Sequence, residues 1–293
     1  MRIAAIYDIH ANLPALEAVI GKIRQEQVDI VVVGGDVLPG PMPLETLERL
    51  QDLDVPVRFV YGNGEVAVLE QLAGRDPAAV PEPYRPIIRW TAEQLDPEHQ
   101  RFLAAWPKTL CLNLPGLGEA LFCHATPRNE NECFTRLTPE SRLLPVFAGL
   151  GAALVVCGHT HMQFDRKVGT TRVVNAGSVG MPFGQPLADW LLLGPEVELR
   201  HTRYDLPKAA ERIRATNYPQ AEYCSKQRPP TPHGEGHARG VLPRGAEVGR
   251  VAACGRFEER FAVCSPESFL NRTGITACSQ KTFGSLTCLF PAC

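Results

Sequence analysis

The chain has 293 residues, 44% of them hydrophobic, which is enough for one large hydrophobic core or two modest ones. Its formal net charge of -2 excludes the strongly basic surface with which proteins bind long nucleic acids or anionic membranes. The opening apolar segment turns polar at Asp8, too early for a signal peptide, and no later apolar run approaches the roughly 18 residues of a membrane helix. We therefore expect a soluble cytoplasmic protein.

Three strand-like segments in the N-terminal part are each followed by a polar loop and a helical pattern. The strands are expected at residues 2–7, 29–33 and 57–61, and helices at 14–25 and 44–53. Strand–helix units in succession indicate a largely parallel sheet with crossover helices. In such α/β sheets, ligands bind beyond the carboxyl ends of the strands.

The middle of the chain alternates between helical and strand-like patterns. Residues 65–106 read as an excursion of two or three helices beside that sheet edge, and a helix is expected at 140–150. Strand-like segments return at 109–114, 120–123 and 152–156. Further β segments follow at 164–168, 171–175, 189–193 and 196–203. Their short Gly-containing connections predict antiparallel hairpins that form a second sheet, and a helix at 206–216 is expected to follow them.

The composition changes beyond residue 222. Residues 223–293 are rich in Pro, Gly, Arg and Ser, and carry nine Lys and Arg against five Asp and Glu, a local net charge of +4. Such a segment cannot bury much apolar surface, so we expect a disordered tail. It holds six of the ten cysteines, but their spacing is irregular and lacks a Cys-x-x-Cys pair, so a metal or disulfide module is the less favoured alternative.

Residues able to bind metal ions follow directly on several of the expected strands. They are Asp8, His10, Asp36, Asn63, His124, His159 and His161. Alone, each has an ordinary explanation as a helix cap, a turn residue or a hydrogen-bonded core histidine. Their joint occurrence predicts a metal centre. Two carboxylates, four imidazoles and one amide suit two ions such as Mn²⁺, Fe²⁺ or Zn²⁺, whereas the oxygens are too few for Ca²⁺.

The spacing of these residues resembles a known family. Asp8-x-His10, Gly35-Asp36, Gly62-Asn63, His124 and Gly158-His159-Thr160-His161 are similar to the five motif blocks of the calcineurin-like metallophosphoesterase superfamily, in particular its small bacterial and archaeal phosphodiesterases. Asn175-Ala176-Gly177-Ser178 resembles a further segment of that family. The resemblance covers residues 1 to about 232, and implies an α/β fold, the two-sheet αββα sandwich, with residues 1–222 as the metallophosphoesterase domain.

The resemblance also implies roles for the residues. Asp8, His10 and His161 would hold one ion, Asn63, His124 and His159 the other, and Asp36 would bridge them. We predict His10, Asp36, Asn63 and His161 as catalytic residues, and Asn12 and Ser178 as substrate contacts. The implied reaction is hydrolysis of a small phosphodiester by attack of a hydroxide that bridges two divalent ions, with Mn²⁺ as the first choice of metal.

One position departs from the family pattern. Many relatives carry His directly after the Asn, where this chain has Gly64 followed by Glu65. Loss of a general acid typically costs 10²–10⁴-fold in rate for poor leaving groups, which favours a diester or an activated ester as the substrate. Two alternatives stay open. One is a phosphomonoesterase or dinucleoside-polyphosphate hydrolase, and the other is a non-catalytic scaffold of the same fold.

Overall fold

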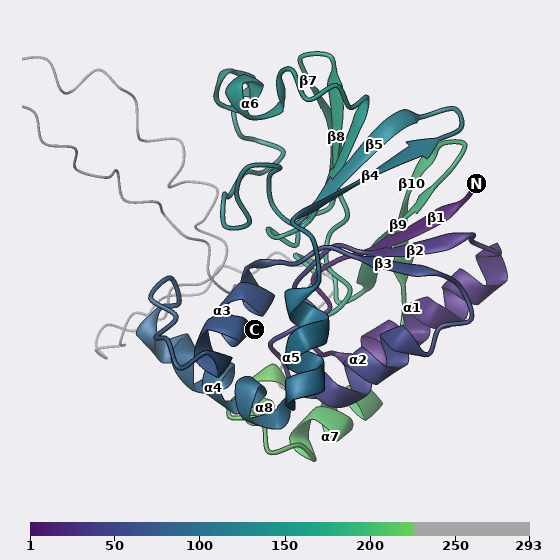
Figure 1. Ribbon diagram of the computed structural model, residues 1–293. Helices are drawn as coiled ribbons and strands as arrows, with labels where there is room; N and C mark the ends of the chain where they lie inside the picture. The colour runs from purple at the N-terminus through teal and green to yellow at the C-terminus, as the bar shows by residue number, and fades with distance from the viewer. Residues whose placement is uncertain (226–293) are drawn as a thin grey trace, which may run out of the picture. The chain divides into compact units, whose positions relative to one another are not determined.

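The computed structural model describes residues 1–225, which form two five-stranded sheets with helices on their outer faces (Figure 1). The first sheet has the strand order β10-β9-β1-β2-β3 and the second the order β4-β5-β6-β8-β7. The strands of the first sheet are β1 (Ile3–Ile6), β2 (Ile30–Val33), β3 (Val57–Phe59), β9 (Ala188–Leu193) and β10 (Val197–Thr202). Those of the second are β4 (Thr109–Leu114), β5 (Gly118–Cys123), β6 (Leu154–Cys157), β7 (Phe164–Val168) and β8 (Thr171–Asn175).

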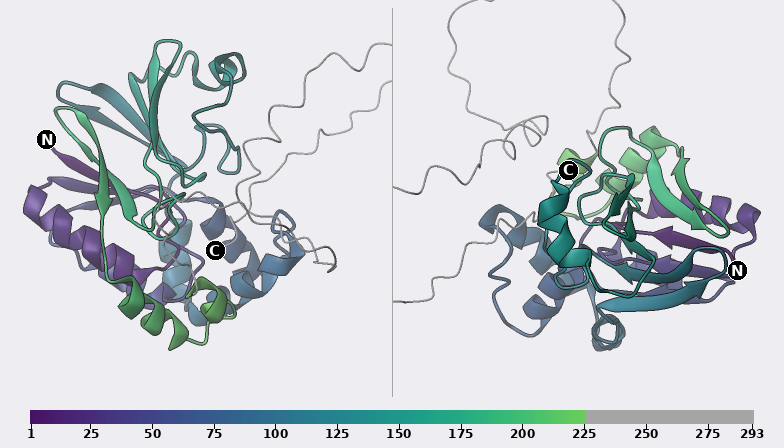
Figure 2. Two further views of the ribbon diagram at one scale, coloured as in Figure 1. Left: turned by 180° about the vertical axis from the view of Figure 1, so that it is seen from behind. Right: turned by 90° about the horizontal axis from the view of Figure 1, so that it is seen from above.

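The helices lie on both sides of this pair of sheets, as the two further views confirm (Figure 2). They are α1 (Leu13–Glu26), α2 (Pro43–Gln51), α3 (Asn63–Leu72), α4 (Arg85–Gln94), α5 (Pro97–Ala104), α6 (Glu140–Phe147), α7 (Leu206–Arg214) and α8 (Ala221–Cys224), with a 3-10 turn η1 at Glu82–Tyr84. Within residues 1–225, α6 covers the outer face of the second sheet, whereas the other helices lie on the side of the first (Figure 1). The αββα sandwich expected from the sequence is therefore confirmed.

Three apolar layers follow from the alternation of side chains along the strands. In β1, Ala4 and Ile6 pack toward the helices of the first sheet, while Ile3 and Ala5 pack between the two sheets. On the other side of the second sheet, Val155 of β6 belongs to a third cluster with the buried face of α6. Strands buried on both faces read as continuous apolar runs, and this explains the sequences IAAI and LVVC of β1 and β6.

The prediction that all four late β segments join the second sheet is half wrong. β7 and β8 form an antiparallel hairpin there, but the hairpin of β9 and β10 belongs to the first sheet, where β9 pairs antiparallel with β1. The reason is the apolar character of β9, in which all six residues are buried. Trp190 and Leu192 face the helices, and Leu191 and Leu193 face the second sheet. Such a strand needs an apolar layer on each side.

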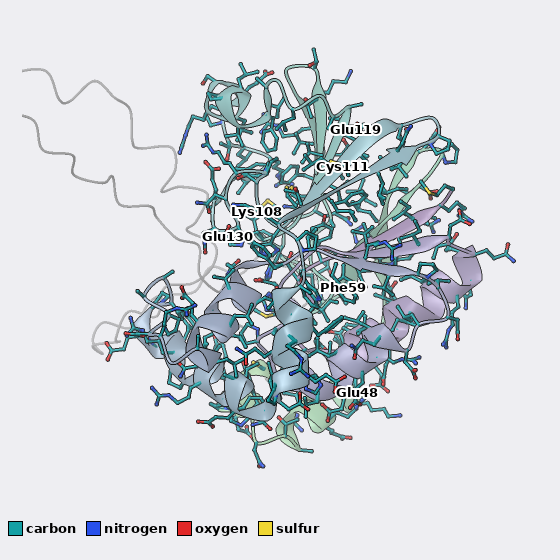
Figure 3. All side chains as sticks on the ribbon, in the orientation of Figure 1. Glu48, Phe59, Lys108, Cys111, Glu119 and Glu130 are labelled. Atoms are coloured by element: carbon teal, nitrogen blue, oxygen red, sulfur yellow. The ribbon has the colours of Figure 1, made fainter. Side chains whose placement is uncertain are left out.

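The excursion predicted at 65–106 is helical and consists of α3, η1, α4 and α5. Phe59 on β3 faces it (Figure 3), with its ring stacked on Trp106 at 4.6 Å between centroids and edge-on to Phe102 of α5 at 5.3 Å. Aromatic pairs of this kind hold the excursion against the edge of the first sheet. Because α3 begins at Asn63, the excursion starts at one of the candidate metal ligands.

The predicted tail falls almost entirely outside the described residues. The expectation of disorder for residues 223–293 therefore concerns a part of the chain that the structure does not describe, apart from 223–225. There, α8 runs to Cys224 and so crosses the predicted domain boundary at residue 222. Across residues 1–225, every helix falls short of the length and apolar character that a membrane crossing needs.

Candidate metal centre

The seven candidate ligands lie beyond the carboxyl ends of five strands, six on loops and Asn63 at the first residue of α3. Asp8 and His10 follow β1, Asp36 follows β2, Asn63 follows β3, His124 follows β5, and His159 and His161 follow β6. Each is at most 4% exposed. Parallel strands place their carboxyl ends at one edge, and the two sheets direct these edges toward each other, so the side chains of distant segments meet.

The backbone turns sharply at most of these ligands. Asp8, His10, Asp36, His159 and His161 all have positive φ, between +47° and +68°. Non-glycine residues seldom adopt this left-handed conformation, and it clusters at functional sites because the surrounding structure must enforce it. Gly158 is required beside them, since a Cβ there would overlap Oδ2 of Asp8. The turns point the side chains back over the strand ends.

Asp8 is fully buried, and one of its two carboxylate oxygens has a hydrogen-bond partner among the described residues. Its Oδ2 accepts a hydrogen bond of 2.9 Å from the backbone N–H of His159. Its Oδ1 has no hydrogen-bond partner among the described residues and lies 3.4 Å from Nε2 of His161 and 3.8 Å from Nε2 of His124. A buried carboxylate oxygen without a partner is costly in a folded protein. A cation beside Oδ1 would satisfy it.

Asp36 lies between two groups of imidazoles. Its Oδ1 is 3.5 Å from Nε2 of His124 and accepts a hydrogen bond of 2.7 Å from the N–H of Gly64, while its Oδ2 is 3.8 Å from Nε2 of His10. The candidate ligands form two sets, and within each set the three ligand atoms lie within 4.8 Å of one another. The sets are Asp8–His10–His161 and Asp36–His124–His159. Asp36 thus presents one oxygen to each group.

In their neutral tautomers, the imidazole nitrogens of His124 and His161 that face the centre would carry lone pairs. Nδ1 of His124 donates to the carbonyl of Gly34 (2.9 Å), and Nδ1 of His161 donates to the carbonyl of Met181 (2.7 Å). In the neutral rings this leaves both Nε2 atoms unprotonated. Nε2 of His161 lies 3.1 Å from Nε2 of His10, and Nε2 of His124 lies 3.2 Å from Nδ1 of His159. Close pairs of inward-facing nitrogens suit a shared cation.

The pKa values of the imidazoles differ: burial lowers the pKa of His124, but the charges of Asp36 and Asp8 outweigh it and raise that pKa, whereas two other rings shift downward. Burial lowers the pKa of His10 to about 3, helped by the neighbouring charge of His161, and burial beside His124 lowers the pKa of His159 to about 3. These two rings are therefore neutral ligands at pH 7. Burial raises the pKa of Asp36 to about 7, against the opposing charge of His124. A cation at Asp36 would ionise it.

Asn63 completes the second group. Its Oδ1 lies 3.0 Å from Nε2 of His124, and its position at the start of α3 fixes the side chain near the end of β3. The orphaned Oδ1 of Asp8, the facing lone pairs and the mixed nitrogen and oxygen donors together fit two borderline divalent ions. By this test, Asp8, His10 and His161 would hold one ion, and Asn63, His124 and His159 the other.

Glu65 supports the site in a way that the sequence analysis did not anticipate. Its buried carboxylate accepts three backbone N–H bonds, from Asp36 (2.8 Å), Leu38 (3.0 Å) and Gly62 (2.8 Å). It thereby ties the loop after β2 to the loop after β3. The signal was present in the sequence, because a Glu three residues after a helix N-cap is typical of a capping box.

Cys133 is a second neighbour that sequence reasoning missed. Its Sγ lies 3.3 Å from Nε2 of His159, on the side of the ring that faces away from His124. Nothing in the spacing of the cysteines connects Cys133 to the histidine motif, so the sequence carried no signal for this contact. It leaves Nδ1 as the nitrogen with which His159 faces the centre.

The two residues predicted as substrate contacts have different surroundings. Ser178 is fully buried, and its hydroxyl donates to the carbonyl of Asp8 (2.7 Å) and accepts from the N–H of Met181 (2.7 Å). These bonds hold Ser178 beneath the Asp8 loop, and its substrate contact stays a prediction. Asn12 caps α1 through a bond from Ala15 N–H and also lines a cavity next to His10. Its substrate contact stays a prediction.

The comparisons with known proteins agree with this geometry. The family model of the calcineurin-like phosphoesterase superfamily domain matches residues 1–193, a range that includes all seven candidate ligands. The chain is 29% identical to the uncharacterized protein MJ0912 of Methanocaldococcus jannaschii over 243 residues, which are 74% of this chain and 94% of that protein.

Solved structures show the same fold. A metallophosphoesterase from Sphaerobacter thermophilus is similar with a TM-score of 0.59 and 26% identity, over 77% of this chain and 96% of that one. The hypothetical protein PH1004 from Pyrococcus horikoshii OT3 has a TM-score of 0.66 and 20% identity, with the same coverage of 77% and 96%. The chain belongs to the calcineurin-like phosphoesterase superfamily and is a hydrolase of phosphoric ester bonds.

Proposed function

We propose that the protein hydrolyses a small phosphodiester with two divalent metal ions bound at the candidate metal centre, Mn²⁺ being the first choice and Fe²⁺ or Zn²⁺ the alternatives. The observation that carries the proposal is the placement of Asp36, with one carboxylate oxygen toward each of two groups of buried ligands. When bound, two such ions supply Lewis-acid charge to the phosphoryl oxygens and lower the pKa of water toward neutrality.

The chain's own residues would orient the reactants. Asp36 is fixed by the N–H of Gly64, and Asp8 by the N–H of His159, so neither carboxylate has to reorganise when a substrate arrives. The carbonyls of Gly34 and Met181 hold His124 and His161 in the tautomer whose Nε2 faces the centre. A preorganised and buried site of this kind excludes bulk water from the reacting phosphorus.

The metal content and activity of matched variants test the proposal. We expect two equivalents of metal in the wild type by elemental analysis, and hydrolysis of bis(p-nitrophenyl) phosphate with added Mn²⁺. Asp36→Ala should lower turnover more than Asn63→Ala does, because Asp36 faces both groups and Asn63 only one. His99→Ala, at a histidine outside the centre, should leave both readouts unchanged. Equal residual turnover in the Asp36 and Asn63 variants would contradict the bridging role.

The same samples separate the alternatives. Faster turnover of p-nitrophenyl phosphate than of its bis ester would favour a monoesterase over a diesterase. A protein that takes up less than two equivalents of metal and hydrolyses neither ester would be a scaffold. The proposed preference for a diester rests on the absence of a side chain at Gly64, where many relatives supply a general acid.

A further inference from the structure

A cavity lies next to the candidate metal centre. His10 and Asn12 line it together with residues of the loop at 180–186, of α7 and of the segment that leads into α8. Ala209, Ile213 and Tyr218 belong to this lining and are all buried. His10 belongs both to the lining and to the ligand group around Asp8, so the cavity adjoins the place where a phosphoryl group would bind.

The lining of the cavity is uncharged. Apart from the candidate ligand His10, the described residues that line it include no Asp, Glu, Lys, Arg or His, and four of them are prolines, Pro39, Pro41, Pro182 and Pro186. Polar and apolar atoms contribute about equally to the lining. The amide of Asn12 donates to the carbonyl of Gly180 at 2.9 Å and lies 3.5 Å from the hydroxyl of Tyr204. A second phosphate or a carboxylate would find no cation here.

The volume of the cavity limits what fits. It measures about 120 Å³, and an apolar protein cavity of roughly 150 Å³ accommodates benzene. One ring or a short branched chain is therefore the largest group that the closed part holds.

We propose that this cavity binds one organic group of the phosphoester substrate, and that this group is uncharged and about the size of one aromatic ring. The inference rests on the proposed function, since it places the phosphoryl group at the metal centre. It also sets dinucleoside polyphosphates apart from the substrates of this protein, because their additional phosphates would enter a cavity without a positive charge.

Two phosphonates that are not hydrolysed test the cavity without turnover. Methylphosphonate and benzylphosphonate carry the same anionic group and differ by one ring. We expect calorimetry on the Mn²⁺-loaded full chain to show benzylphosphonate binding at least tenfold more tightly, equivalent to about 1.4 kcal/mol. Its heat capacity of binding should also be the more negative, since burial of apolar surface has that signature. Equal affinities of the two phosphonates, or no binding of either, would overturn the inference.

A matched pair of variants on α7 and its C-terminal end locates the ring. Ala210 lines the cavity, whereas Ala215 is exposed and lies outside it. Ala210→Leu should reduce the preference for benzylphosphonate to less than threefold without changing the affinity for methylphosphonate. Ala215→Leu should keep the wild-type preference. A full preference in Ala210→Leu would show that the ring binds elsewhere.

Failure of the proposed function gives a different result. Hydrolysis of bis(p-nitrophenyl) phosphate is measured in the same samples. A protein that prefers benzylphosphonate but hydrolyses no ester would contradict the proposed function and support the cavity. A protein that hydrolyses the ester and binds both phosphonates equally would support the proposed function and contradict the cavity proposal.

Discussion

Replacing Glu65 by glutamine removes the charge and one acceptor from the buried group that joins two ligand loops. In the native protein Oε2 accepts the N–H groups of Asp36 and Gly62, and Oε1 accepts that of Leu38. Glutamine keeps one oxygen, and its NH₂ group can only donate. At least one of the three backbone N–H groups therefore loses its acceptor in the interior, where no water replaces it.

The size of the effect follows from these three bonds. A buried donor left without an acceptor costs about 1–3 kcal/mol, and each of the two remaining bonds changes from charge-assisted to neutral at about 1 kcal/mol. We therefore expect Glu65→Gln to lower the free energy of unfolding by about 3–5 kcal/mol, a large share of the roughly 5–15 kcal/mol of a typical domain. Asp36 should also lose its fixed position, so metal affinity should fall with stability.

Urea denaturation in the presence of a chelator measures the change without a contribution from bound metal. Glu70→Gln is the matched control on the same helix, because Glu70 is partly exposed, and its effect should stay within about 0.5 kcal/mol. A loss below about 1 kcal/mol in Glu65→Gln would refute the reasoning. Burial raises the pKa of Glu65 while the three N–H bonds oppose that rise. A carboxyl that stays protonated would already resemble glutamine and would produce this small loss.

Further predictions concern two glycines and one buried carboxylate. Gly64→Ala should destabilise the protein by about 1–3 kcal/mol, because its Cβ would overlap the carbonyl oxygen of Leu38. Gly21→Ala, at an exposed position inside α1, should instead stabilise it by about 1 kcal/mol. Thermal unfolding measures both changes. Burial raises the pKa of Asp189 from 3.8 to about 6, against the opposing hydrogen bond and charge of His201. Between pH 4 and 6 the native state thus keeps a proton that the unfolded chain has released. The resulting contribution to the free energy of unfolding, up to about 3 kcal/mol, is present below pH 4 and is lost as the pH rises to 6. Urea midpoints from pH 4 to 7 should show this loss in the wild type but not in Asp189→Asn.

The sequence indicated the candidate ligands because each of them stands within a few residues of a strand end. Asp8, Asp36 and His124 stand at the ends of apolar runs, and a strand end is a local feature that needs no knowledge of partners. Parallel packing then brings these ends together. The motif spacing added the assignment to a family, which the match over residues 1–193 confirms.

What the sequence could not show depends on contacts between distant segments. The hairpin of β9 and β10 was placed in the wrong sheet because alternation defines a strand but not its neighbour. The partner of β9 is β1, about 185 positions earlier in the chain. The bond from the Ser178 hydroxyl to the carbonyl of Asp8 is likewise a contact between distant segments, and the sequence carried no signal for it.

The absence of a general acid after Asn63 is tied to the architecture of the site. The carboxylate of Glu65 draws the backbone from Asp36 to Leu38 onto the start of α3, and this close approach leaves no space for a Cβ at position 64. The bonds that fix the ligand loops therefore exclude the histidine that many relatives carry there. No acidic side chain compensates in the described part of the cavity beyond His10, so a leaving group has to depart without a proton from that side. Alcohols of low pKa do so readily, whereas poor leaving groups lose roughly 10²–10⁴-fold in rate without an acid. If the proposed function holds, the same loop contact that orders the candidate ligands should therefore favour activated esters and diesters as substrates.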